Sequence, residues 1–211
     1  MADSGTPVLT RISVRAPSKY AGQLPNAHAF VPPPLEWLYR TWSVTHSTLS
    51  MWRSARNVRI TYKPYEVDKS SSRAIDDLVE YEKKGSRPGI KRVEGIDRPD
   101  PGSPGAWNWR GKGWLRIASS HWEILGYGER PLAAAEDGAR VERWVVTWFA
   151  PTLFTQEGLD IYSDRREGLS RETIEAIMEA LKNLDEAPKI VTLVEKQMQP
   201  VEISLPWQEK K

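Results

Sequence analysis

The stretch GLDIYSDRREGLSRETIEAIMEAL spans residues 158–181 and passes from a strand pattern into a helix pattern. Its first six residues predict a short strand. Ser170 is a favourable N-cap, and Glu172 follows in the first turn, where the helix dipole favours a carboxylate. The next apolar residues have the spacing of one helix face: Ile174, Ile177, Met178 and Leu181. We therefore predict a helix over residues 170–184 with one buried face.

The chain before this stretch is dominated by strand patterns. Apolar and polar residues alternate within residues 40–50, 57–66, 107–109, 114–126 and 141–150. Residues 73–81 also alternate, although a short helix fits them nearly as well. A single amphipathic helix after so many strands has only the outside of the sheet to pack on. We predict a mainly β fold: an antiparallel up-and-down barrel with one C-terminal helix packed on the outside.

The two ends of the chain differ from the strand-rich middle. Residues 1–34 are rich in Pro, Ser and Ala and lack periodicity, which predicts an extended or disordered arm that folding does not need. Residues 35–186 are expected to form the barrel domain. Residues 187–211 form a C-terminal extension, in which KIVTLVE (189–195) and VEISLPW (201–207) are each candidates for a further strand.

Composition narrows the class of protein. The 211 residues are enough for one domain, and 30 basic side chains against 28 acidic ones leave a net charge of only +2. That balance argues against nucleic-acid binding. There is no cysteine, which excludes disulfides and thiolate metal sites. No secretory signal and no apolar run of about 20 residues is present, so we expect a cytoplasmic protein without a membrane span.

Two segments resemble the lipocalins, a family of calycin barrels. RTWSVTHST (40–48) is similar to the first lipocalin strand, in which a Gly-x-Trp motif sets a Trp at the closed end of the barrel, and Trp42 is the matching residue. Arg40 stands where the family has Gly. Residues 158–181 are similar to the lipocalin ending, where the last strand leads through a basic residue into a Leu-Ser-x-Glu helix. The resemblance covers roughly residues 36–186.

This resemblance implies a lipocalin-like barrel with a specific contact at its closed end. In the family the basic residue after the last strand lies over the conserved Trp. Arg165 or Arg166 would then meet the indole of Trp42 through cation–π and hydrogen-bond contacts.

The high number of tryptophan residues predicts that several of them lie in the interior of the barrel. The chain has ten Trp and three Phe, and a Trp carries a large apolar surface with an N–H that needs a partner. In a barrel of about eight strands, alternate residues point inward and enclose either packed side chains or one small ligand. Some Trp residues are expected to plug the barrel ends or lie under the helix. The predicted ligand-binding residues are Trp42, Val44, His46, Ile60, Tyr62, Trp109, Arg116, Trp122 and Trp148.

Three functions remain open on this basis. The first is the binding of a small hydrophobic or aromatic molecule by a carrier or sensor. The second is a cofactor-free isomerase, dehydratase or cyclase of specialised metabolism, with His46, Tyr62 and Arg116 as catalytic candidates. The third comes from the haem-binding calycins called nitrobindins, with His46 as the haem ligand. No spaced His motif and no Ser nucleophile elbow occurs, so we predict neither a metal site nor a hydrolytic triad.

Overall fold

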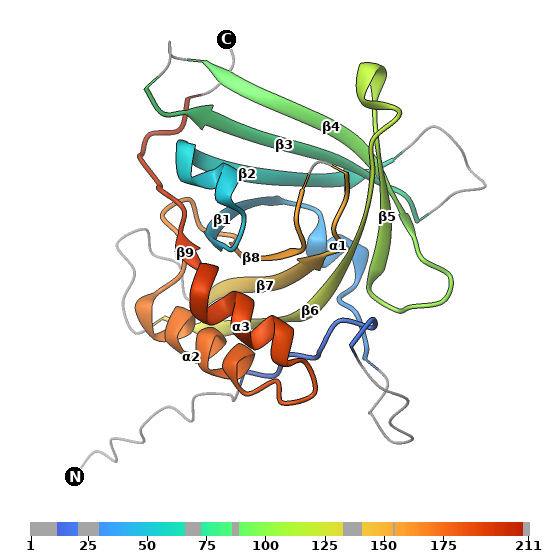
Figure 1. Ribbon diagram of the computed structural model, residues 1–211. Helices are drawn as coiled ribbons and strands as arrows, with labels where there is room; N and C mark the ends of the chain where they lie inside the picture. Colours follow the sequence, from blue (N-terminus) through green and yellow to red (C-terminus); the bar gives the residue numbers. More distant parts are fainter. Residues whose placement is uncertain are drawn as a thin grey trace.

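The computed structural model describes residues 12–20, 30–65, 73–85, 89–132, 141–153 and 155–208. Successive strands pair antiparallel, and β1 pairs with both β2 and β8, which closes an eight-stranded barrel (Figure 1). The predicted fold class is confirmed. The strands are β1 (Thr41–Ser47), β2 (Ala55–Pro64), β3 (Ile75–Lys83), β4 (Ile90–Pro99), β5 (Ala106–Gly111), β6 (Ser119–Pro131), β7 (Val141–Phe149) and β8 (Gly158–Ser163), and a short β9 (Gln199–Pro200) lies beside β1.

The main helices follow the last barrel strand. Helix α2 (Arg171–Lys182) begins after Ser170, whose Oγ accepts a hydrogen bond from the backbone N–H of Thr173 at 3.3 Å, as the capping pattern predicts. The described residues also form three short helices elsewhere: α1 (Leu35–Leu38), η1 (Ser50–Ser54) and η2 (Gly113–Leu115).

A second C-terminal helix, α3 (Pro188–Gln197), occupies the region where a strand was one expectation. That expectation for residues 189–195 is wrong. Pro188 lies in the first helical turn, where its missing N–H costs nothing. Ile190, Leu193 and Val194 are buried at the spacing of one helix face. Burial of that face therefore outweighs the strand preference of the β-branched residues.

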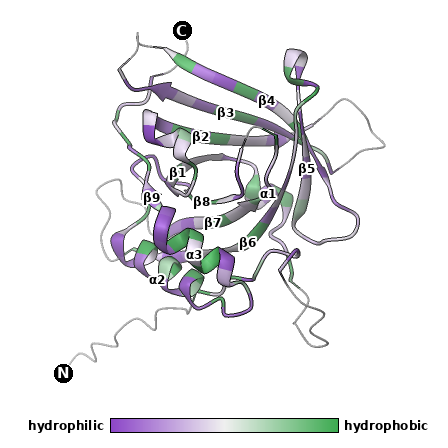
Figure 2. Ribbon diagram, viewed as in Figure 1, coloured by the Kyte–Doolittle hydropathy of each residue, from purple (hydrophilic) through white to green (hydrophobic). Residues whose placement is uncertain are grey.

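The barrel wall separates two apolar cores. The outer core lies between α2, α3 and the outward faces of β6, β7 and β8, and includes Trp144, Trp148, Ile161, Ile177 and Leu181. The inner core fills the closed end of the barrel and includes Leu38, Trp42, Val44, Trp107 and Ile124. Figure 2 shows that both C-terminal helices mix hydrophobic and hydrophilic residues, as helices with one buried face do.

The closed end is built around Trp42. Its Nε1 donates to the backbone oxygen of Leu38 in α1 at 3.0 Å, and its side chain has no exposed surface. The guanidinium of Arg40 lies 5.3 Å from the Trp42 ring centroid, so the residue that replaces the family glycine supplies a cation–π contact. Arg166 lies over the ring of Trp207 at 5.0 Å. A contact of Arg165 or Arg166 with Trp42 stays a prediction.

Residues 12–20 of the predicted arm pack on the outside of the barrel. The backbone N–H of Arg15 donates to Leu125 in β6 at 2.8 Å, and Ile12 is buried in the outer core. The carboxylate of Glu123, which has no exposed surface, forms an ion pair with Arg15 at 2.8 Å and accepts hydrogen bonds from the N–H and hydroxyl of Ser18. This segment thus satisfies a buried charge on β6.

Deletion of residues 1–18 is therefore expected to destabilise the protein, in place of the sequence-based expectation of a dispensable arm. Loss of Arg15 and Ser18 leaves Glu123 buried without its main partners, which costs on the order of 3–5 kcal/mol. Thermal unfolding checks the effect. Deletion of residues 1–11 is the control, because it keeps these contacts. Equal melting temperatures for the two deletions would show that the segment contributes nothing.

Candidate functional site: a barrel cavity with buried carboxyl groups

The barrel encloses a cavity of about 570 Å³ that opens at the end formed by η1, the β5–β6 hairpin and the loop after β7. This is the end opposite α1 and Trp42. Most of the cavity wall is apolar. Its aromatic and aliphatic lining consists of Leu49, Trp52, Ile60, Tyr62, Val79, Val93, Trp109, Trp122, Phe149 and Tyr162. A volume of this size can hold one small molecule.

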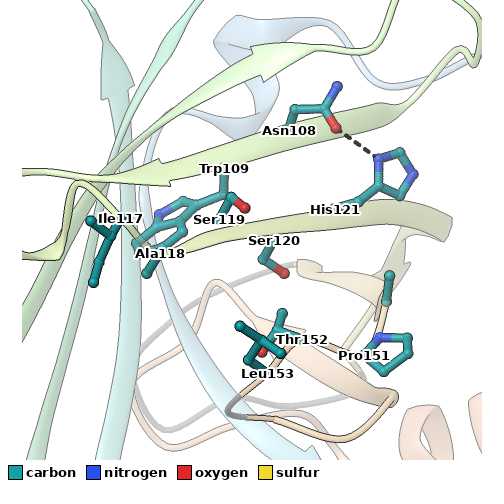
Figure 3. A pocket seen from close by; sticks show the side chains of 11 residues that line it. Asn108, Trp109, Ile117, Ala118, Ser119, Ser120, His121, Pro151, Thr152 and Leu153 are labelled. Atoms are coloured by element: carbon teal, nitrogen blue, oxygen red, sulfur yellow. Dashed lines mark hydrogen bonds between the residues drawn. The ribbon is translucent and has the colours of Figure 1, made fainter.

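A second hollow of about 530 Å³ lies at the mouth, between the β5–β6 hairpin and the loop after β7. Figure 3 shows Thr152 and Leu153 of that loop facing Trp109 and Ser120 of the two strands. The hollow adjoins the barrel cavity, because the two share the lining residues Trp109, Ile117, Ala118, Ser119, Ser120 and Thr152.

Large apolar side chains are exposed around the mouth of the cavity. Trp114 is 87% exposed, Ile117 is 89% exposed and Leu153 is 95% exposed. The first two belong to the turn between β5 and β6, and the third to the loop after β7. An exposed apolar patch at the mouth of an apolar cavity is typical of a binding site.

Four of the predicted ligand-binding residues line the cavity, namely Ile60, Tyr62, Trp109 and Trp122. Trp42 and Val44 also point inward, but they pack in the inner core. The ring of Trp122 stacks on Tyr62 with centroids 5.8 Å apart and on Trp107 at 5.9 Å. The wall is therefore stiffened by stacked rings. A contact of these residues with a ligand stays a prediction.

The structure places His46 on the outside of the barrel, contrary to the sequence-based expectation. A β-bulge between Val44 and His46 shifts the pairing with β8, so that His46 lies opposite Ile161 of the outer core. The extra residue reverses the inside-outside alternation that holds up to Val44. Burial lowers the pKa of His46, and its Nδ1 has no hydrogen-bond partner among the described residues.

Two further residues predicted to face the cavity lie elsewhere. Arg116 belongs to the turn after η2, where its side chain is exposed and its backbone oxygen accepts from Arg110. The strand expected over residues 114–126 begins only at Ser119, and Gly113 turns the chain with a φ of 58° that favours glycine. Trp148 lies in the outer core and donates to Glu157 at 3.0 Å.

Three carboxyl groups that are not among the predicted site residues lie inside the barrel. Trp122 Nε1 donates to Asp97 Oδ1 at 2.8 Å, and Trp109 donates to Asp77. Gly95 makes room for the second contact, because a Cβ at that position would lie 2.0 Å from Trp109 Nε1. The two indoles thus each hold one carboxyl group of the β3–β4 pair.

Burial in this apolar setting changes the acidity of the pair. Loss of hydration raises the pKa of Asp97 to about 7. The pKa of Asp77 is raised well above its usual value, first by burial and then by the negative charge of Asp97. Hydrogen bonds from the indoles oppose both shifts. Both causes favour the uncharged, protonated form of Asp77.

A third carboxyl group lies on the opposite wall. Asp160 of β8 lines the cavity, and burial raises its pKa to about 7, while a hydrogen bond from Ser47 and the charge of Arg53 oppose the shift. Two phenols connect the walls: Tyr62 is the cross-strand partner of Asp77, and its hydroxyl donates to Tyr162, two residues from Asp160 on β8.

One signal in the sequence indicated Asp77. It interrupts an inward-facing row of apolar residues on β3, formed by Ile75, Val79 and Tyr81. Polar residues at core positions of a strand depart from binary patterning unless they serve a function. Asp76, the neighbour of Asp77 on β3, points to the opposite face of the strand.

These features define the class of protein. A closed antiparallel barrel of eight strands, with a buried Trp at the closed end and helices after the last strand, is the lipocalin fold. A solved structure agrees with this fold: insecticyanin from the tobacco hornworm Manduca sexta is 13% identical, with a TM-score of 0.54 over 87% of this chain and 88% of that chain. H1 crustacyanin from the lobster Homarus americanus is 10% identical, with a TM-score of 0.49 over 96% and 94%.

The sequence identity with one known protein is high enough to show the family of this chain. Botcinic acid biosynthesis cluster B protein 12 of Botryotinia fuckeliana is 30% identical over 175 residues, which cover 81% of this chain and 75% of that protein. The chain belongs to the same family as this protein. No family model matches the chain.

The described residues were also compared with what a metal site and a membrane-spanning helix require. Among those residues, no three His, Cys, Asp or Glu side chains are grouped so that they could hold a metal ion. Within the same residues, no helix has the length and apolar character needed to cross a membrane. The cytoplasmic location stays a prediction.

Proposed function

We propose that the protein binds a small, mainly apolar molecule in the barrel cavity. The observation that carries this proposal is the enclosed volume of about 570 Å³ lined by aromatic rings. A cavity of that size and lining matches the usual small-molecule site, which is concave and mostly apolar with a few polar groups. The exposed Trp114, Ile117 and Leu153 at the mouth give an apolar ligand a path to the interior.

The binding of a neutral fluorescent probe tests this proposal. N-phenylnaphthylamine is expected to give saturable fluorescence enhancement, because the probe leaves water for an apolar cavity. Val79→Phe adds bulk to the cavity wall and is expected to weaken binding by about tenfold or more, which corresponds to ~1.4 kcal/mol. Native mass spectrometry of the freshly purified protein identifies any molecule that it retains.

The matched control is Leu78→Phe. Leu78 is the neighbour of Val79 on β3 and points to the other face of the barrel wall, since adjacent strand residues alternate. It should leave probe affinity unchanged. Equal affinities in the two variants would place the probe outside the barrel, and the absence of saturable binding would contradict the proposal.

A second candidate is catalysis on the bound molecule by a cofactor-free isomerase, dehydratase or cyclase. Two observations favour it over a pure carrier. The relative in Botryotinia fuckeliana is named for a biosynthesis cluster. The cavity also holds carboxyl groups with raised pKa, which are typical of acid–base sites. Of the three catalytic candidates from the sequence, only Tyr62 lines the cavity. His46 points outward, so it is not placed to ligate a haem in the barrel cavity.

A further inference from the structure

The cavity holds two carboxyl groups that each have one oxygen without a hydrogen-bond partner in the described part of the chain. Asp77 is 7% exposed and Asp160 is 5% exposed, and both line the cavity. Oδ1 of each has no hydrogen-bond partner among the described residues. A buried oxygen without a partner costs free energy in the empty protein. A ligand that hydrogen-bonds to these oxygens would recover that cost.

The charges around these oxygens restrict the chemistry. None of the described lining residues is Lys, Arg or His. The cavity therefore disfavours an anionic ligand. Neutral carboxyl groups donate a hydrogen bond to a carbonyl or hydroxyl oxygen, which suits an apolar molecule that carries oxygen at one end.

The two acids lie in different settings on opposite walls. Asp77 has a second carboxyl group beside it, that of Asp97, which disfavours its ionisation. Asp160 accepts a hydrogen bond from Ser47, and the positive charge of Arg53 attracts its carboxylate. Both interactions favour the ionised form of Asp160. When two titratable groups lie in environments that push their pKa values apart, the group with the higher pKa serves as the acid and the other as the base.

We propose that Asp77 and Asp160 are a catalytic acid–base couple that moves a proton from carbon to oxygen in an apolar, carbonyl-bearing ligand. This inference rests on the proposed binding of such a molecule in the cavity. The carboxylate of Asp160 removes a hydrogen from the carbon next to the carbonyl, and the C–H electron pair forms a C=C bond. The carbonyl π pair takes the proton of Asp77, which leaves an enol, a protonated Asp160 and an ionised Asp77.

The reverse steps complete an isomerisation without any co-reactant. In a ligand with a C=C bond beside the carbon that loses its hydrogen, the enol is conjugated, and Asp160 returns its proton to the far carbon of that bond. The enol O–H then returns its proton to Asp77. Both acids regain their starting states, and the double bond of the ligand has shifted. Tyr62, the cross-strand partner of Asp77, donates to the hydroxyl of Tyr162, and both phenols line the cavity.

Nitrobenzisoxazole is a suitable probe of this couple. A base removes its ring C–H proton, the N–O bond breaks, and the product is a cyanonitrophenol whose oxygen takes a proton. We expect the protein to accelerate this opening, with a loss of about 100-fold in Asp160→Asn and about tenfold in Asp77→Asn. The control Asp76→Asn, on the outward face of β3, should leave the rate unchanged. Nitroindazole, an unreactive probe of the same shape, measures binding through tryptophan fluorescence in every variant.

The pH profile of the opening reports which acid is the base. The rate is expected to rise with pH and to level off above a midpoint near the Asp160 pKa of about 7. The charged and titratable groups facing Asp160 are Arg53 of η1 and Tyr162 of β8, and neither changes charge near pH 7. Asp160→Asn should abolish this midpoint.

The possible results separate the inference from the proposed function. Bound nitroindazole without accelerated opening, or opening that survives both Asn substitutions, would overturn the acid–base couple while ligand binding stands. No binding of nitroindazole by the wild type would overturn both. Opening that disappears in the two variants while nitroindazole still binds supports the couple.

Discussion

Leu181→Asp is expected to unfold or aggregate the protein. Leu181 has no exposed surface and lies in the outer core between α2 and the barrel wall. Removal of its side chain costs about 2–5 kcal/mol, and an unpaired carboxylate in its place adds several more. The sum is comparable to the whole stability of a typical domain. Circular dichroism and size-exclusion chromatography check this result.

Lys182→Asp is the matched control. It introduces the same residue one position later, where the side chain of α2 is exposed. The expected cost is below about 1 kcal/mol, from the loss of a favourable cation at the helix C-terminus. An unchanged unfolding curve for Leu181→Asp would show that the barrel does not depend on the docking of this helix.

The second large effect is a fall in stability as the pH rises from about 4 to 8. The folded-state pKa of Asp97 and of Asp160 is about 7, above the ordinary value of 3.8. Between these values the folded protein binds more protons than the unfolded chain, so a rise in pH favours unfolding. A shift of about 3 pKa units corresponds to an upper limit of ~4 kcal/mol for each carboxyl group. The stability is greatest at the acidic end of this window.

Urea unfolding at several pH values checks this prediction. Asp97→Asn keeps an oxygen to accept from Trp122 but cannot ionise, so its stability should fall less steeply with pH than that of the wild type. Asp76→Asn, at the half-buried ion pair with Lys112 on the outward face of β3, should keep the wild-type slope. The same slope in Asp97→Asn and the wild type would show that Asp97 does not control the pH dependence.

Local patterning was enough to predict most of the architecture. Strand alternation and the cap at Ser170 each depend on interactions within a few residues, and they predicted the barrel and α2 correctly. The strand expected at residues 189–195 failed because Val and Ile favour strands locally. The outer core instead buries one helical face of that segment.

Strand alternation predicted the inward face correctly for four residues of the candidate site, and their contact with a ligand stays a prediction. Ile60, Tyr62, Trp109 and Trp122 lie in regular parts of their strands and line the cavity. His46 follows a bulge that no local pattern in the sequence of its strand predicts. The single extra residue of the bulge moves the side chain of His46 to the other face of the barrel wall.

The sequence by itself determined the fold class, the position of the barrel Trp residues along the chain and the amphipathic helix after the last strand, because periodicity records which faces are buried. Only the tertiary structure decided which Trp residues face the cavity, since Trp122 and Trp148 have equally regular surroundings and lie on opposite sides of the wall. It also decided the chemistry of the acids. Asp77, Asp97 and Asp160 are far apart in the sequence, and their shared burial, which raises their pKa values, arises only when the barrel closes.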